Sequence, residues 1–597
     1  MTEGGVTERG HFFSGIAERF RLFLRNDQLI LSILAAVVGL LTGASVVAFR
    51  EGIDFFKKLS FGSDTERFYQ YVETLPWWQI VLVPTLGGLC VGLLVRIGLP
   101  GHRPHAVADV IEASALKGGQ MSLTTGLRAA LINALSLGVG ASAGQEGPAV
   151  HLGASLGSMV GKRLRLSRKL MRTLLGCGVA SAVAASFNAP IAGALFASEV
   201  VLGHYALSAF APIVIASVAG TVVSQAYFGD YPAFIISDYI IASFWEFPAF
   251  IGLGIVSALV AVVFMRAIHT AEGLSLRIPV ISWFRPAIGG FMVGVMAIFL
   301  PQILGVGYGA TEAALLVTFS LSLLIAIGIA KVAATAISIG FGFGGGVFSP
   351  SLVIGAMVGG SYGVIVTQMF PDLSSGIGAY TLVGMGSVAA AVLGAPISTT
   401  LIIFEMTGDY KITMAVMLSV VIASTITRQI YGPSFFAVQL ERRGLDLKAG
   451  FEMTVLRSVR VGAVISDADA ITTPDVSLPA IRRLLQDASF GELFVVREDD
   501  TLFGTITLAD LSETAFDDDY DILIRAADVA RMKPPVLYYD DTLERAMAVM
   551  READEEHIAV LRSEDDRTFL GCAHERDVMA AYSRELIKTR REEHGED

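Results

Sequence analysis

Long apolar runs separated by short polar breaks extend over the first three quarters of the chain. Five of these runs are long enough to cross a bilayer as helices, near residues 28–49, 77–98, 207–226, 246–268 and 283–304. The other apolar segments are shorter or are broken by glycine and proline, at 122–141, 148–160, 169–185, 190–203, 320–341, 348–370 and 377–427. This mixture of complete and partial spans predicts a helical membrane protein with helix ends inside the bilayer.

The pattern changes near residue 457, where short apolar strands alternate with acidic turns and helices. The segment 504–510 recurs as 571–577, since 571 − 504 and 577 − 510 are both 67. Each copy follows an apolar strand, at 493–496 in the first and at 558–561 in the second, and leads into a helix. The chain is therefore expected to end in two small α/β units.

The membrane part contains a duplication of its own. GQEGP at 144–148 and GVFSP at 346–350 are equivalent, because 346 − 144 and 350 − 148 both give 202. Ala-Pro-Ile followed by a glutamate occurs at 189–199 and at 395–405, where 395 − 189 and 405 − 199 both give 206. The repeats run from about 28 to 227 and from about 245 to 440. Matching interruptions in two repeats point to a transport site between them.

The residue types in the two interrupted segments favour the binding of an anion. Non-helical backbone is tolerated within a bilayer only where protein or a water-filled cavity satisfies its polar groups. Pro148 and Pro350 are each expected at the first position of a helix, where amide N–H groups lack partners and the helix dipole adds positive charge. The amides of Gly147, Val347 and Phe348 are then the natural donors to a bound anion.

Glu146 is expected directly before one of these helix starts. When ionised, its carboxylate is an anion tethered beside an anion site and can occupy that site. When protonated, it loses this attraction and swings away, which predicts a plug controlled by pH and by the competing ion. The alternative is that Glu146 only stabilises a helix start. An ionisable residue at membrane depth is costly and functional by default, which favours the plug.

Composition and charge fit a membrane protein with a separate acidic tail. Of the 597 residues, 53% are hydrophobic and 17% are charged. Residues 457–597 hold 32 Asp and Glu against 17 Lys and Arg, so nucleic acid is not an expected partner. The cysteines have no metal-ligand spacing, and no nucleophile–base set suggests an enzyme, so no metal or required cofactor is expected. Basic residues before the first apolar run predict a cytoplasmic segment at 1–27.

The interrupted segments resemble the signatures of the CLC family of chloride channels and proton/chloride exchangers. The resemblance rests on GQEGP at 144–148, GFGGGVFSP at 342–350 and FNAPIAG at 187–193, and it covers residues 28–445. It implies an all-α polytopic membrane domain with inverted repeats and with chloride bound at helix N-termini. It also implies a homodimer in the cell membrane, with one ion path in each subunit.

The tail resembles a pair of CBS domains, the regulatory module that often binds adenine nucleotides. This implies a linker at 446–456, cytoplasmic CBS domains at 457–520 and 521–590, and an acidic end at 591–597. In that family a Ser/Thr-x-x-Asp element contacts the nucleotide. Thr507 and Asp510 match it, whereas the second copy keeps Asp577 but has His574 in place of the hydroxyl residue. Nucleotide binding and a purely structural module that joins two subunits are both open.

Three departures from the family pattern bear on transport. Gly101 stands where the earlier anion loop of relatives has a serine, and Phe436 replaces a tyrosine that faces the central ion. Val200 occupies the position at which exchangers carry a proton-passing glutamate. Passive chloride conduction through a glutamate-gated pore is therefore favoured over proton-coupled antiport, the alternative. A membrane-anchored CBS sensor is a remote third hypothesis. Glu199 and its repeat mate Glu405 are expected to have structural pairing roles.

Overall fold

The computed structural model describes residues 27–65, 67–230, 241, 243–445, 456, 459–468, 470–488, 491–511 and 523–594. The chain divides into two compact units, Met1–Leu447 and Lys448–Asp597. Nearly all of the expected N-terminal segment at 1–27 and of the linker at 446–456 lies outside the described residues. The same holds for the end of the expected first CBS domain, at 512–520.

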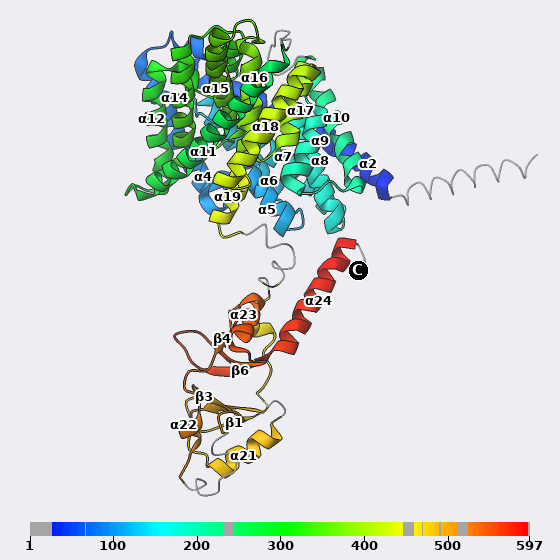
Figure 1. Ribbon diagram of the computed structural model, residues 1–597, viewed down its shortest axis with the longest axis vertical. Helices are drawn as coiled ribbons and strands as arrows, with labels where there is room; N and C mark the ends of the chain where they lie inside the picture. Colours follow the sequence, from blue (N-terminus) through cyan, green and yellow to red (C-terminus); the bar gives the residue numbers. More distant parts are fainter. Residues whose placement is uncertain are drawn as a thin grey trace, which may run out of the picture. The chain divides into compact units, whose positions relative to one another are not determined.

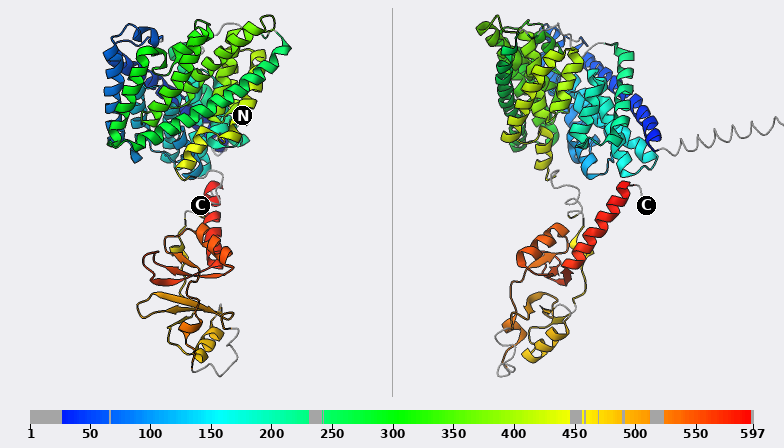
Figure 2. Two further views of the ribbon diagram at one scale, coloured as in Figure 1. Left: turned by 60° about the vertical axis from the view of Figure 1, so that its left-hand side comes forward. Right: turned by 45° about the vertical axis from the view of Figure 1, so that its right-hand side comes forward.

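The first unit is an all-helical bundle, as the sequence predicts, and its long helices pack side by side (Figure 1). Further views show the same packing (Figure 2). Among the described residues, nine helical segments are long and apolar enough to cross a membrane. The helices of the unit are α2 (Asp27–Phe61), α3 (Phe68–Val72), α4 (Trp77–Gly98), α5 (Val107–Leu116), α6 (Leu123–Gly138), α7 (Glu146–Arg163), α8 (Arg168–Phe187), α9 (Pro190–Phe196), α10 (Leu207–Phe228), α11 (Phe247–Arg277), α12 (Arg285–Phe299), α13 (Tyr308–Leu315), α14 (Leu321–Gly340), α15 (Phe348–Met369), α16 (Ile377–Leu393), α17 (Pro396–Thr407), α18 (Tyr410–Ile430) and α19 (Phe435–Arg442).

Both interrupted segments lead into helices, but these helices begin before their prolines. α7 begins at Glu146 and α15 begins at Phe348, so Pro148 and Pro350 are third in their helices rather than first. Proline is tolerated there because the first amides of a helix have no partner within the helix. The prediction that Glu146 precedes its helix is therefore wrong, since Glu146 is the first helical residue.

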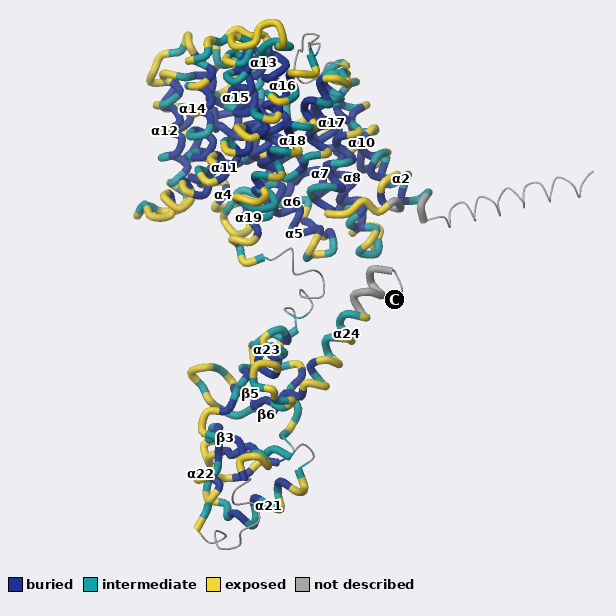
Figure 3. The backbone as a smooth tube through the Cα atoms, viewed as in Figure 1, coloured by how far each residue is buried: buried dark blue, intermediate teal, exposed yellow. Residues whose placement is uncertain are grey.

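Glycines that recur in the two repeats allow helix pairs to pack closely. A Cβ at Gly153 would lie 2.4 Å from the carbonyl oxygen of Gly178, and a Cβ at Gly355 would lie 2.4 Å from that of Gly384. Side chains at these positions would force α7 from α8 and α15 from α16. The interior around these four helices is almost continuously buried (Figure 3).

In each repeat, a glutamate caps the start of a helix that belongs to the other repeat. Glu199, in a π-helical turn at Ala197–Leu202, accepts hydrogen bonds from the amides of Ile397 at 3.0 Å and Ser398 at 2.8 Å, at the start of α17. Glu405 in α17 accepts in turn from the amides of residues 191 and 192, at the start of α9, at 2.8 and 2.7 Å. Both carboxylates thus have the structural pairing role that their repeated positions indicate.

The second unit contains two copies of one small α/β arrangement, as predicted. In each three-stranded sheet the first strand is parallel to the second, and the second is antiparallel to the third, in the orders β1-β2-β3 and β4-β5-β6. The elements are β1 (Ile471–Thr472), α21 (Leu478–Asp487), β2 (Glu492–Val496), β3 (Leu502–Thr507), α22 (Ala526–Val529), β4 (Val536–Tyr538), α23 (Leu543–Ala553), β5 (His557–Leu561), β6 (Phe569–His574) and α24 (Glu575–His594).

The two copies exchange short segments. Val461 and Val464 pack into the core of the second sheet, whereas Ala526 and Ala530 pack into the core of the first. The expected boundary between residues 520 and 521 thus separates these segments from the sheets they support. Residues 591–594 of the expected acidic end belong to helix α24, and residues 595–597 lie outside the described residues.

Candidate anion site

Gly144 and Gly346 form an antiparallel bridge that joins the two interrupted segments. The amide of Gly144 donates to the carbonyl oxygen of Gly346, and the amide of Gly346 donates to that of Gly144, both at 2.7 Å. A Cβ at Gly346 would lie 3.1 Å from the amide nitrogen of Gly147, so the two backbones are in contact. The starts of α7 and α15, including Val347 and Phe348, therefore meet at one point.

The carboxylate of Glu146 lies against the start of α15. Glu146 is 1% exposed. The hydroxyl of Ser349 lies within hydrogen-bond reach of both carboxylate oxygens and donates to one of them at a time. The amide of Ser349 donates to Oε2 at 3.2 Å, and the hydroxyl of Tyr308 donates to Oε1 at 2.8 Å. An ionised carboxylate accepts hydrogen bonds at both oxygens, so these donors suit a negative charge at this position.

Tyr308 is positioned by a buried lysine. The Lys331 ammonium on α14 donates to the carbonyl oxygens of Ile303 at 3.0 Å and Gly305 at 2.8 Å, which fixes the loop before α13. Gly307, with a left-handed φ of 95°, then turns the chain into α13, whose first residue is Tyr308. Lys331 thus supports the loop that carries the tyrosine to Glu146.

Neither Ser349 nor Tyr308 is among the sequence-predicted donors. Ser349 follows Val347 and Phe348 in the GVFSP motif, and a hydroxyl at a helix start is a usable signal because such residues pair with free amides. Tyr308 lies 162 residues from Glu146 in sequence, and no local pattern relates the two. At the start of α15 it is Ser349 that donates to Glu146. Ser349 lies one residue after the expected donors Val347 and Phe348.

Two cavities approach this junction. The arginine cavity, about 420 Å³ and named for its five arginines, reaches the backbone of Gly345 beside the bridge. The tyrosine cavity, about 560 Å³, is lined by Tyr308 and Gln145, which are in contact with each other and adjoin Glu146. Among the described residues the two cavities share no lining residue. Glu146 therefore lies between two separate cavities, with Gly345 lining one of them and Gln145 and Tyr308 lining the other.

The other predicted pore residues lie on different elements. Gly101 is exposed in a 3-10 turn at Pro100–His102, with a left-handed φ of 68° that suits glycine. Phe436 is buried at the start of α19. Their neighbours His102 and Phe435 line the arginine cavity. Val200 is half-buried in the π-helical turn and packs against the core.

In the tail, the chain itself engages the predicted nucleotide contacts. The amide and hydroxyl of Thr507 both donate to Asp510 Oδ2 at 2.8 Å, and Asp577 accepts from the hydroxyl of Ser466 at 3.2 Å. A cavity that His574 helps to line holds about 10 Å³, room for one water at most. Within the described parts of both units, no group of three or more His, Cys, Asp or Glu could hold a metal ion.

Sequence comparisons identify the family. The profile described as "Voltage gated chloride channel" matches residues 87–428, and the CBS domain profile matches residues 526–584. The Voltage-gated ClC-type chloride channel ClcB of Escherichia coli O17:K52:H18 is 30% identical over 407 residues, or 68% of this chain and 97% of that protein. A protein of Ralstonia nicotianae described as ClcB-like is 32% identical over 417 residues, or 69% of this chain and 97% of that protein.

Solved structures show the same fold. A slow cyanobacterial Cl⁻/H⁺ antiporter matches with a TM-score of 0.63 and 23% identity, covering 69% of this chain and 97% of its own. A eukaryotic CLC transporter matches with a TM-score of 0.60 and 17% identity, covering 92% of this chain and 98% of its own. From the profile match, the ClcB relatives and the duplicated fold, this chain belongs to the CLC family of anion transport proteins and ends in a pair of CBS domains.

Proposed function

We propose that the protein conducts chloride passively along a path that the carboxylate of Glu146 closes. The observation that carries this proposal is the set of donors around Glu146: two hydroxyls and one amide, from Ser349 and Tyr308. A buried donor left without a partner costs about 1–3 kcal/mol. These donors therefore favour either the carboxylate or an ion of like charge in its place.

The exchange between carboxylate and chloride needs no charged partner. Hydroxyl and amide donors bind a halide firmly enough to replace part of its hydration, yet release it again. Protonation of Glu146 weakens its attraction to these donors, and a high chloride concentration displaces the carboxylate by mass action. Such an ion would be held between the two cavities, at the donors that now bind the Glu146 carboxylate.

Passive conduction is favoured because Val200 supplies no titratable group at the position where exchangers carry a second glutamate. The ClcB relatives are also described as chloride channels. Proton-coupled antiport is the second candidate. The contact from Tyr308 to Glu146 supports it, because this hydroxyl joins the gate to the tyrosine cavity and offers a proton route from that side.

Flux from purified protein in liposomes, with chloride and proton movement recorded together, tests the proposal. Wild-type protein should carry chloride down its gradient without moving protons uphill. Glu146→Ala should carry chloride at a rate that no longer depends on pH, because the plug is absent. Glu312→Ala is a matched control, since this glutamate also lines the tyrosine cavity but pairs with Arg67 at 3.3 Å.

Each outcome separates the candidates. Uphill proton movement driven by a chloride gradient would establish antiport in place of conduction. Unchanged pH dependence in Glu146→Ala would contradict the plug itself. Absence of anion flux from wild-type protein would favour a membrane-anchored sensor.

We also infer that both termini lie in the cytoplasm and that the protein is a homodimer in the cell membrane. The orientation is supported by the basic connection between α7 and α8, which carries lysine or arginine at 162, 163, 165, 168 and 169. The dimer is inferred from the family resemblance.

A further inference from the structure

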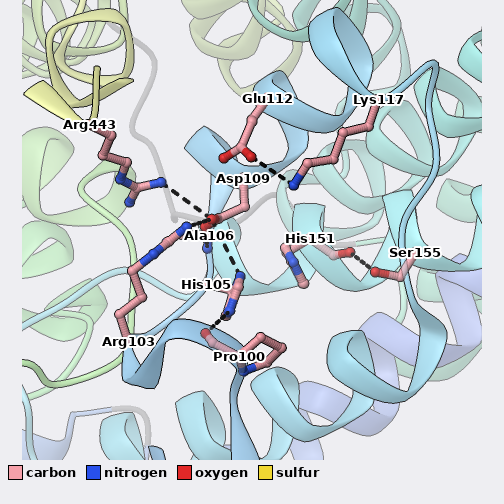
Figure 4. Close-up of polar contacts among 10 residues, drawn as sticks. All are labelled: Pro100, Arg103, His105, Ala106, Asp109, Glu112, Lys117, His151, Ser155 and Arg443. Atoms are coloured by element: carbon pink, nitrogen blue, oxygen red, sulfur yellow. Dashed lines mark hydrogen bonds and ion pairs between the residues drawn. The ribbon is translucent and has the colours of Figure 1, made fainter. Parts of the chain in front are cut away.

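A single carboxylate, that of Asp109, contacts arginines from two other segments (Figure 4). All three residues line the arginine cavity. Asp109 Oδ1, on α5, lies 2.5 Å from Nη2 of Arg103, in the loop after the turn at Pro100–His102. It also lies 3.3 Å from Nη1 of Arg443, directly after α19. The other oxygen accepts from the amide of Ala106 at 2.9 Å. Asp109 is only 8% exposed, so the loop, α5 and α19 meet at a buried ion cluster.

A histidine extends the cluster toward the gate-bearing helix. His105 Nδ1 lies 3.4 Å from the same oxygen of Asp109, and His105 Nε2 lies 3.2 Å from the carbonyl oxygen of Pro100. Both ring nitrogens of His105 therefore face oxygen atoms of the chain. The ring centroid of His105 is 5.5 Å from that of His151, on α7. The cluster therefore contacts the helix that begins with Glu146.

The charges around the arginine cavity are unbalanced. Five arginines line it, and the carboxylates that line it are Asp109 and Glu272. Counting the arginines and carboxylates alone, five positive and two negative charges leave three positive charges in excess. The Glu272 side chain is 55% exposed, whereas that of Asp109 is buried among the guanidinium groups it holds. Asp109 is thus the buried charge that offsets the repulsion between Arg103 and Arg443.

We propose that Asp109 is a positioning residue that sets the width of the arginine cavity and thereby the size of anion that passes. The inference rests on the proposed function. The loop that Asp109 holds carries Gly101, and the helix it holds carries Phe436, so one carboxylate fixes the spacing of both. Removing one partner of a buried ion pair leaves the remaining charges uncompensated. Without Asp109, Arg103 and Arg443 repel each other and the walls separate.

Asp109→Asn in full-length protein tests this in liposomes, with chloride and the larger anion isethionate as the two permeants. The preference for chloride over isethionate should fall by about threefold or more, because specificity here depends on excluding the larger ion. The chloride concentration that gives half-maximal flux should also fall, because the cavity gains one net positive charge. A residue with a merely structural role would lower flux without this pattern.

Glu112→Gln is the matched control. Glu112 lies on the same helix and pairs with Lys117 at 2.7 Å, but it does not line the arginine cavity (Figure 4). This variant should keep the wild-type anion preference. If Asp109→Asn does not fold, Arg103→Gln and Arg443→Gln each remove one arm of the cluster, and each should lower the preference.

The outcomes are distinguishable. Wild-type preference in folded Asp109→Asn, or in both arginine variants, would overturn the inference alone. An equal change in Glu112→Gln would do the same, since the effect would then belong to α5 as a whole. No anion flux from wild-type protein would overturn the proposed function and, with it, the inference.

Discussion

Glu492, at the start of β2 in the tail, faces more negative than positive charge. Burial first, and then repulsion from Glu555, raise the pKa of Glu492 to about 7. Arg531 opposes this shift, but its guanidinium is already engaged by Glu555, at 2.6 Å. At intermediate pH the folded tail therefore keeps a proton that an unfolded chain releases. No sequence pattern marks Glu492, because its repelling partner is contributed by the other CBS copy.

The tail should lose stability as pH rises from about 4.5 to about 7. Over this range the unfolded chain ionises at Glu492 while the folded state still binds the proton, so each step in pH favours unfolding. Below about pH 4.5 Glu492 is protonated in both the folded and the unfolded chain, so its contribution to stability is complete. Above about pH 7 it is ionised in both, so the loss of stability no longer grows. The loss is at most about 3–4 kcal/mol, at about 1.4 kcal/mol for each unit of pKa shift. Amide hydrogen exchange of β2 and β3 in full-length protein, at pH 5 and pH 8, measures it.

Glu492→Gln removes the titrating group and should make the opening free energy of β2 and β3 nearly constant over this range. Glu498→Gln changes an exposed glutamate just after β2 and should retain the wild-type pH dependence. A pH dependence that survives unchanged in Glu492→Gln would assign the effect to another group.

At the scale of elements, the carboxylates that cap helices across the repeats show which features the sequence predicts and which it does not. The repeat identifies Glu199 and Glu405 as equivalent and structural, but the amides they bind are 198 and 214 residues away. A periodic pattern finds an element and often its ends, whereas partners at such separations are set by packing. The starts of α7 and α15 differ from prediction for a local reason, because a first turn tolerates proline at more than one position.

Glu199→Ala and Glu405→Ala should each destabilise the membrane unit by about 1 kcal/mol, the usual cost of losing a helix N-cap. In a protein of this size that corresponds to a fall of about 1–2 °C in the melting temperature. Thermal unfolding in detergent measures the shift, with Glu73→Ala, at an exposed helix end, as the control. Two variants that melt like wild type would show that these caps contribute nothing to stability.

For the whole molecule, the sequence predicts the two kinds of unit, the duplication in each and the segments that form the anion site. It does not predict Tyr308 at Glu146, or Arg443 at Asp109 across 334 residues. Such contacts exist only once the bundle is assembled. The sequence does predict that Glu146 and Gly147 lie beside Val347 and Phe348, because this expectation needs only the repeat.

The CBS pair should show no thermal shift with millimolar ATP, ADP or AMP. Thr507 is already bonded to Asp510, and Asp577 is bonded to Ser466, so both matching carboxylates are engaged. A nucleotide at one hundred times its dissociation constant would add about 2.7 kcal/mol to stability. Thermal unfolding of full-length protein, followed in the tail, checks this; sodium phosphate at equal ionic strength is the control. A shift specific to an adenine nucleotide would contradict the prediction.

The bridge between Gly144 and Gly346 is made entirely of main-chain atoms. A methyl group at Gly144 would lie 3.0 Å from the Glu146 carboxylate, so both geometry and room depend on glycine there. The glycines before Gly346 are restricted as well, because a Cβ at Gly344 would lie 2.2 Å from the side-chain oxygen of Asn133 and a Cβ at Gly345 would lie 2.4 Å from the Cβ of Ala143. Evolution can therefore retune the ion preference of this junction through side chains outside the glycine-rich backbone, such as those of Ser349 and Tyr308, while the scaffold that aligns the two halves is inherited unchanged.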